Sequence, residues 1–156
     1  MCLLVKSYHL SEEPIECYKV LRRQSVSDEL TSPFAGFIWE VGKTYTDEAK
    51  EIFVPSGNYS FPLASDLTRF PKLEPQYKGE LSQGVFHAFK TLEGAEELRR
   101  HFRLEEIPRL FSGDAMRIYV IAKCVIPKDT WFCSGEDTAT GCECYGSKVL
   151  TITGIL

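Results

Sequence analysis

The amino-acid sequence predicts an α+β fold: a mostly antiparallel, strongly bent sheet with one main amphipathic helix. Several segments alternate apolar and polar residues, which is the pattern of half-buried strands. One segment repeats apolar residues at three- and four-residue spacing, as a helix docked through one face does. With 156 residues and 44% hydrophobic content, the chain has the size of one ordinary domain, so we expect residues 1–156 to form a single globular domain.

The first half of the chain predicts two strands. Residues 16–22 alternate weakly and suit a strand. Residues 37–45 are clearer, because four large apolar residues share one parity: Phe37, Trp39, Val41 and Tyr45. We expect a short helical turn at residues 47–52.

Residues 55–78 are rich in turn formers and predict a long loop. Prolines at this density exclude a long helix or a central strand. Large apolar residues are interleaved with the turn formers: Tyr59, Phe61, Leu63, Leu67, Phe70 and Tyr77. A loop of this length inside a compact domain is either functional or packed as a lid.

The second half predicts the helix and the strongest strand. Residues 84–90 read as a strand, and Thr91 is placed to cap the following helix, whose apolar stripe is Leu92, Ala95, Leu98 and Phe102. In residues 116–126, one parity is wholly apolar: Met116, Ile118, Val120, Ala122, Cys124 and Ile126. Turns at residues 127–129 and 135–141 then separate two further strand-like segments, the last within residues 142–156.

Charge and hydropathy exclude several classes of protein. The net charge is −4 and the 18 basic residues are scattered, whereas a nucleic-acid binder concentrates positive charge on one face, so we expect no nucleic-acid partner. No segment approaches roughly 18 consecutive apolar residues, so we expect no membrane-spanning helix. The opening "MCLLVKSYHL" lacks the basic region and cleavage site of a signal peptide, which predicts a cytoplasmic protein.

Six cysteines in a cytoplasmic protein are expected to stay reduced. A zinc site would combine Cys133, Cys142 and Cys144 with Cys124 or His87, but the usual C-x2-C or C-x4-C spacing is absent. A cysteine nucleophile would pair Cys133 or Cys144 with His87. Free cysteine behaves mainly as a small buried apolar residue, so we expect core thiols and no metal.

Two short motifs have simple structural explanations. "VGKT" at residues 41–44 resembles the end of a phosphate-binding loop, but that loop needs a glycine at position 37, which is Phe37. Gly42 is therefore interpreted as a bulge or turn. His87 alternates with Val85 and Phe89 along a strand, where a histidine is more often structural than catalytic.

The order of segments resembles a set of small uncharacterised proteins from gut bacteria and their phages. It runs through "ECYKVL", "WEVGKTY", "GVFHAFKTLEGAEEL", "VIAKCVIPKDTWFCSG" and "YGSKVLTI", and those proteins share an opening MC-x-x-x-K. The resemblance covers most of the chain. It implies a phage or mobile-element origin and brings no known activity.

The stretch "GVFHAFKTLEGAEEL" is also similar to a segment of ADP-ribosyltransferase-like domains, in which a strand leads into a helix bearing an early alanine. This resemblance implies a sheet that clamps NAD and a late-strand glutamate that orients the reacting ribose. Glu143 would be that glutamate, and His87 would position the nicotinamide ribose. Ala88 or Phe89 stands where the family usually has Ser or Thr.

Taken together, these patterns predict a binding or interaction domain with a protein partner, no cofactor and an undetermined oligomeric state. Its expected binding surface is the aromatic loop against the strand bearing Phe86 and His87, with five binding residues: Trp39, Tyr59, Phe61, Phe70 and Phe86. Equally, the aromatic residues would plug the open end of the bent sheet. The alternative is a divergent ADP-ribosyltransferase-like enzyme that binds NAD and uses His87 and Glu143. An enzyme needs a pocket that gathers these two side chains, whereas an interaction domain needs an exposed apolar patch.

Overall fold

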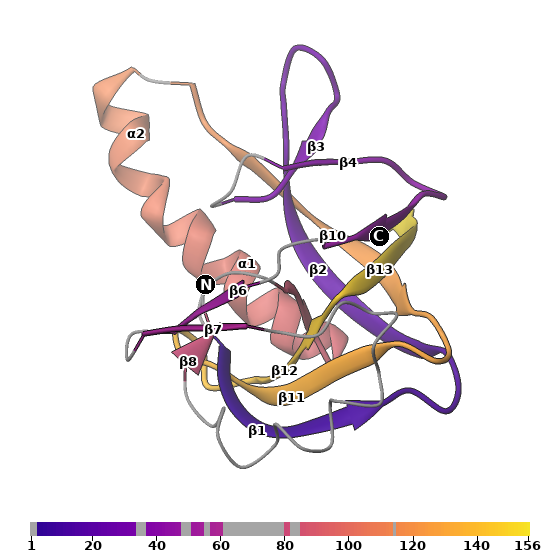
Figure 1. Cartoon of the computed structure of the whole chain (residues 1–156). Helices are drawn as coiled ribbons and strands as arrows, with labels where there is room; N and C mark the ends of the chain where they lie inside the picture. Colours follow the sequence, from indigo (N-terminus) through magenta and orange to yellow (C-terminus); the bar gives the residue numbers. More distant parts are fainter. Residues whose placement is uncertain are drawn as a thin grey trace.

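The computed structural model describes residues 3–33, 37–47, 51–54, 57–60, 80–81, 85–113 and 115–156, with the backbone alone at 51–54, 57–60 and 80–81. The described strands are β1 (Leu3–Leu10), β2 (Ile15–Arg23), β3 (Leu30–Thr31), β4 (Ile38–Trp39), β5 (Thr44–Thr46), β6 (Glu51–Val54), β7 (Gly57–Ser60), β8 (Glu80–Leu81), β9 (Phe86–Phe89), β10 (Ile118–Ile126), β11 (Trp131–Asp137), β12 (Glu143–Ser147) and β13 (Val149–Ile155). Two consecutive helices, α1 (Leu92–Glu105) and α2 (Ile107–Ser112), lie between β9 and β10 (Figure 1).

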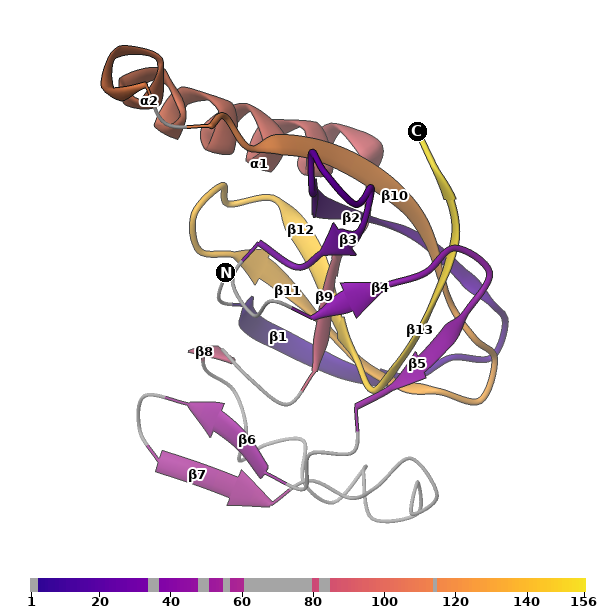
Figure 2. The same cartoon turned by 90° about the horizontal axis from the view of Figure 1, so that it is seen from above.

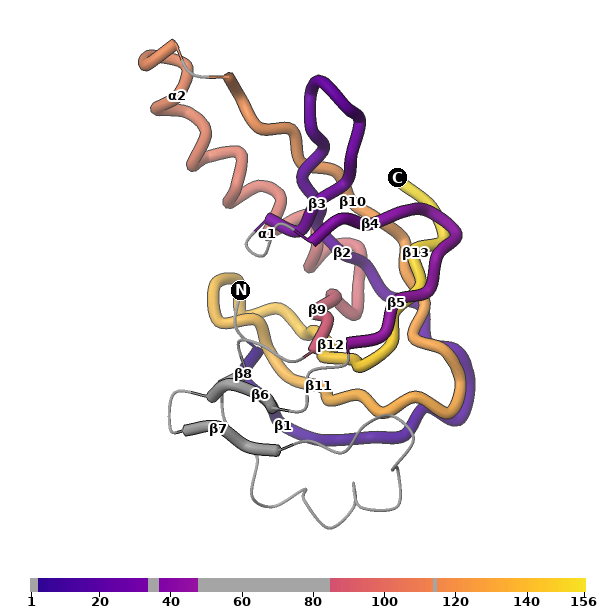
Figure 3. The backbone as a smooth tube through the Cα atoms, turned by 45° about the horizontal axis from the view of Figure 1, so that its top comes forward, coloured from indigo at the N-terminus to yellow at the C-terminus, as the bar shows by residue number. Residues whose placement is uncertain are grey.

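The main sheet is antiparallel at every described pairing, as the sequence predicted for most of it. Its order is β5-β13-β10-β2-β9-β12-β11-β1-β8, with β3 added to β2 and β4 added to β3. The remaining two strands, β6 and β7, pair with each other. Figure 3 shows the last strand, β13, running beside β10 and carrying β5 on its other side.

The helix α1 begins where the sequence predicted. The Oγ1 atom of Thr91 accepts a hydrogen bond from the backbone N–H of Gly94 at 3.2 Å, which satisfies one of the free donors of the first turn. The helix packs against β2, β9 and β10 through three buried side chains, Ala95, Leu98 and Phe102 (Figure 2).

The sheet has a buried cluster on each of its two faces. On the face covered by α1, Val20 and Ile121 pack with the helix, and the ring of Phe102 stacks on Tyr119 with centroids 4.8 Å apart. On the opposite face, Leu21 and Ala122 belong to a second buried cluster with Leu30 of β3, Trp39 of β4 and Ile152 of β13. The sequence predicted that one parity of residues 116–126 is wholly apolar, but Tyr119 and Ile121, at the other parity, are buried as well, because α1 covers that face.

Residues 37–45 do not form the single strand that their alternation predicted. A turn around Gly42, with φ 84°, separates β4 from β5, in agreement with the interpretation of Gly42 as a turn. Phe37 and Val41 are exposed while Trp39 is buried, so the four residues do not share one buried face.

Two predictions for the following segment are also wrong. Residues 51 and 52, expected in a helical turn, belong to strand β6, and residues 57–60 of the expected loop form strand β7. The remaining residues of the expected loop, 55–56 and 61–78, lie outside the described residues.

Candidate functional site

Two of the predicted binding residues, Trp39 and Phe86, lie inside the core. Only 2% of Trp39 and 9% of Phe86 is exposed, and their ring centroids are 5.0 Å apart. Phe37 and Tyr45 complete this aromatic cluster, each with its ring centroid within 5.0 Å of the Trp39 ring. The indole N–H of Trp39 donates to the Oγ atom of Ser32 at 2.7 Å. Trp39 and Phe86 are therefore core residues, whereas the alternative that the aromatic residues of the loop plug the open end of the bent sheet stays a prediction, because their side chains lie outside the described residues.

The other three predicted binding residues cannot be placed in this cluster. Tyr59 lies on strand β7, whose side chains are outside the described part of the chain, and the same holds for all of Phe61 and Phe70.

A buried lysine that the sequence analysis did not select lies against the aromatic cluster. The ammonium of Lys19 donates to the backbone carbonyl of His87 at 2.6 Å and lies 5.3 Å from the centroid of the Trp39 ring. Burial lowers the pKa of Lys19 to about 8, because the charged ammonium loses its water. The sequence does contain a sign of this burial. Lys19 alternates with Cys17 and Leu21 along β2, so its side chain is expected on the same buried face.

His87 and Glu143 lie on neighbouring strands but on opposite faces of the sheet. His87 is paired with Gly146, so its side chain shares the face of residues 144 and 146. Glu143 has the other parity, and its carboxylate forms an ion pair with Lys90 at 3.0 Å. His87 is buried, whereas the side chain of Glu143 is 65% exposed. The structure therefore brings Glu143 to Lys90 and not to His87.

The cysteines of the zinc alternative are partly gathered around strands β11 and β12. Cys133 and Cys144 are buried, and Cys142 is partly exposed just before β12. Burial raises the pKa of Cys133 to about 12, which disfavours the thiolate that a metal would need. Among the residues that the structure describes, no group of three His, Cys, Asp or Glu side chains is arranged to hold a metal ion.

The far end of the helical segment exposes large apolar side chains. Six such residues lie on the last turn of α1, on α2, just before β10 and at the first residue of β10: Leu104, Ile107, Leu110, Phe111, Met116 and Ile118. We call these six residues the apolar end. Figures 1 and 2 show α2 projecting beyond the sheet at the tip of α1. Phe111 is 86% exposed.

Glu106 holds the apolar end together. This residue joins α1 to α2 and is only 2% exposed. Its carboxylate accepts a hydrogen bond from the backbone N–H of Arg117 at 2.9 Å and forms ion pairs with the side chains of Arg109 and Arg117. Arg109 also donates to the carbonyl oxygen of Ala115 at 3.3 Å. These contacts fix α2 against the segment that returns to the sheet.

Comparison with known proteins assigns no family. No family model matches the sequence, and no curated protein or solved structure matches the chain. None of the described helices is both long and apolar enough to cross a membrane.

Proposed function

We propose that this protein is an interaction domain that binds a partner protein through the apolar end. The observation that carries the proposal is the exposure of six large apolar side chains on adjacent segments at one tip of the molecule. Single exposed apolar residues are common on protein surfaces, but a contiguous group marks an interaction site more often.

Phe111 and Leu110 expose apolar surface to water, which is unfavourable, and a partner protein that covered this surface would gain binding free energy. Fully burying one such side chain contributes roughly 1.5–3 kcal/mol. A few side chains of this kind at the centre of an interface commonly supply most of the binding free energy. Phe111, at 86% exposure, and Leu110, at 60%, have the most to gain.

The surroundings of the apolar end suit an interface with a protein. Arg103 and Arg117 are exposed beside it, and arginine is one of the residues enriched at interfaces. The Glu106 contacts hold α2 in place before binding, which lowers the entropy lost on association. The expected partner presents an apolar groove or helix face with acidic groups at its rim.

Removing the apolar side chains tests this proposal. Phe111→Ser and Leu110→Ser lie on a projecting surface and should leave the fold intact. Val26→Ser is the matched control, because Val26 is 98% exposed in a turn far from α2 in the sequence. Protein isolated from its own host cells should retain a partner in stoichiometric amount as wild type and as Val26→Ser, and lose it as Phe111→Ser. A partner retained equally by all variants would refute the proposal.

Concentration-dependent mass measurements of the same proteins identify the partner's nature. If the wild type dimerises at micromolar concentration and Phe111→Ser does not, the partner is a second copy of this chain, and the proposal of a different protein partner is wrong.

We further propose a cytoplasmic location, a strongly bent sheet and an amphipathic α1. The cytoplasmic location is supported by the five described cysteines, which are all free thiols. This holds even for Cys17 and Cys124, which are directly opposite each other on β2 and β10. The amphipathic helix is supported by the burial of Ala95, Leu98 and Phe102, whereas the ion pair between Arg100 and Glu97 joins an exposed and a half-buried side chain.

A further inference from the structure

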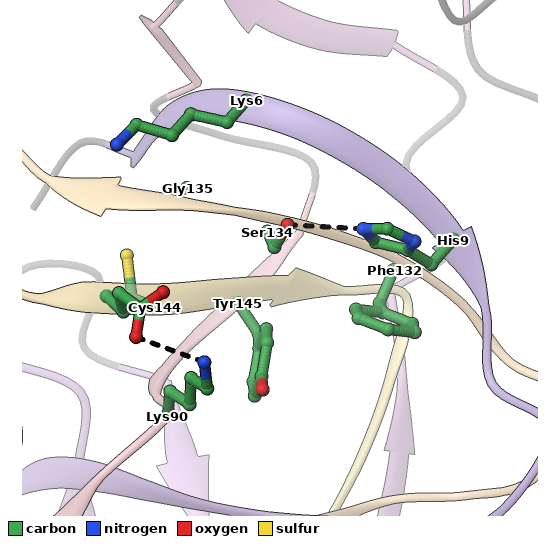
Figure 4. Close-up of a pocket in the computed structure, with 9 residues that line it drawn as sticks. Lys6, His9, Lys90, Phe132, Ser134, Gly135, Cys144 and Tyr145 are labelled. Atoms are coloured by element: carbon green, nitrogen blue, oxygen red, sulfur yellow. Dashed lines mark hydrogen bonds and ion pairs between the residues drawn. The ribbon is translucent and has the colours of Figure 1, made fainter.

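A second site lies on the sheet, away from the apolar end. It is a cavity of about 290 Å³ on the face of strands β1, β11 and β12 (Figure 4). The side chains that line it include His9, Lys90, Phe132, Ser134, Glu143 and Tyr145. We call it the sheet cavity. Its volume is near the lower end of the range for small-molecule sites, about 300–1,000 Å³, so it fits one small ligand.

One side of the sheet cavity is a group of hydrogen-bonding side chains. The imidazole Nε2 atom of His9 lies 3.2 Å from the Oγ atom of Ser134 and 2.7 Å from the Oγ atom of Ser7. The two serine hydroxyls are 2.6 Å apart. Each hydroxyl both donates and accepts, so this side can exchange hydrogen bonds with ligand hydroxyls in either direction.

The charges around the sheet cavity are balanced. Lys90 is paired with Glu143 at 3.0 Å between Nζ and Oε2, and Lys6 is paired with Glu136. A phosphate or carboxylate brought to either lysine would also approach that lysine's glutamate, which would repel it. A neutral ligand with hydroxyl groups meets no such repulsion, because it can accept from the ammonium and donate to the carboxylate.

An aromatic surface completes the sheet cavity. The rings of Phe132 and Tyr145 meet edge to face with centroids 5.5 Å apart, and Figure 4 shows Tyr145 between Lys90 and Phe132. The imidazole of His9 packs on Phe132 at 5.2 Å. Burial raises the pKa of Tyr145, so its hydroxyl stays protonated and can donate at neutral pH.

We propose that the sheet cavity binds a neutral, ring-shaped ligand with several hydroxyl groups, that is, a single sugar unit. The C–H face of the ring packs on the partly exposed Tyr145, whose own ring packs against the buried Phe132. Its hydroxyls bond to the Lys90–Glu143 pair on one side and to Ser134 and His9 on the other. NAD does not fit this description, because its two phosphates would meet lysines that are already paired and its length exceeds a cavity for one small ligand.

Saturation-transfer NMR of the whole protein with D-glucose, D-galactose, D-mannose and N-acetyl-D-glucosamine tests the proposal. At least one sugar should give a transfer signal with its strongest effect on ring C–H protons, at millimolar affinity. Glu143→Gln and Lys90→Met should each weaken that affinity about tenfold, since each removes a hydrogen bond to a charged group.

Glu16→Gln is the matched control for the sheet cavity. Glu16 pairs with Lys123 at 2.7 Å on the sheet, in the same kind of exposed ion pair, but lies outside the cavity. This variant should bind as the wild type does. Absence of a signal from all four sugars would overturn the proposal, as would equal binding by Glu143→Gln or binding of NAD or glucose 6-phosphate without any neutral sugar. Phe111→Ser should keep sugar binding, so this test is independent of the apolar end.

Discussion

The carboxylate of Glu106 accepts a hydrogen bond from the backbone N–H of Arg117 at 2.9 Å, across the whole length of helix α2. The same carboxylate pairs with the side chains of Arg109 and Arg117. One buried side chain therefore connects the end of α1, the helix α2 and the start of β10. The shape of the apolar end depends on this contact.

Replacing Glu106 with alanine should loosen the apolar end. The substitution leaves the N–H of Arg117 without its acceptor and removes two ion pairs, for a loss of about 2 kcal/mol in the free energy of unfolding. Hydrogen exchange should become faster at residues 107–117 and stay unchanged in β9. Glu105→Ala, at an exposed neighbouring position, is the control. Equal exchange in the two variants would show that Glu106 does not hold α2.

Lys19 should make stability depend on pH. Its pKa is about 8 in the folded protein, below its usual value. Below pH 8 the ammonium is charged in both states, and the fold bears the full cost of burying it. Between pH 8 and about 10.5 the folded protein has released this proton while the unfolded chain still holds it, so stability rises with pH in this window.

The variant Lys19→Met removes this titration. It should gain about 3 kcal/mol at pH 7 from the lost burial cost, less about 1 kcal/mol for the carbonyl of His87 that loses its donor. The advantage over the wild type should shrink as pH rises from 8 to 10. Urea unfolding of both proteins at pH 7, 8, 9 and 10 measures it, and a difference that is constant with pH would contradict the account.

Gly146 should not tolerate a side chain. It is paired with His87, and a Cβ atom at this position would lie 2.8 Å from the Sγ atom of Cys133 and 2.9 Å from Val85. Gly146→Ala should therefore lower the free energy of unfolding by about 1–3 kcal/mol, as overpacking does. A Cβ atom at Gly154 meets no atom within 4 Å, so Gly154→Ala should be nearly neutral in thermal unfolding. Equal melting temperatures for Gly146→Ala and Gly154→Ala would show that the neighbouring strands move to make room for the added side chain, which would contradict the prediction.

The cysteines should differ in reactivity. Cys142 is partly exposed, whereas Cys17, Cys124, Cys133 and Cys144 are buried. The experiment uses a Cys2→Ser variant, which leaves these five thiols. Burial raises the pKa of Cys124 to about 12, so its thiolate is scarce at pH 8. A disulfide reagent at pH 8 should modify one thiol in the native protein quickly and the other four at the rate of unfolding. Rapid modification of a second thiol would contradict the described packing.

Local signals were enough to predict several elements. Thr91 caps α1 because its hydroxyl oxygen accepts a hydrogen bond from the first turn, a local interaction that favours threonine just before an amphipathic helix. Residues 118–126 form a strand because the alternation is long and uninterrupted. Residues 37–45 alternate equally well, but Gly42 turns the chain there. The alternation of apolar residues alone cannot distinguish one continuous strand from two short strands joined by a turn.

The candidate sites depend on contacts that no local pattern contains. Glu106 resembles its exposed neighbour Glu105 in the sequence, and only the return of the chain at Arg117 makes it a buried acceptor. Glu143 was selected by a resemblance that paired it with His87, whereas the antiparallel ladder places it beside Lys90, which is 53 residues away. Exposure of Leu110 and Phe111 also needs the three-dimensional position of α2, since their sequence suits a buried helix equally well.

The central claim, that the apolar end binds a partner protein, is tested most directly by photo-crosslinking. A photoreactive phenylalanine analogue placed at position 111 would be irradiated in cells that make the protein, beside a control with the analogue at position 26, which is 98% exposed in the turn that follows β2. The account predicts one discrete protein adduct from position 111 that is absent from position 26 and is suppressed by Leu110→Ser. No adduct at position 111, or the same adducts from both positions, would contradict it.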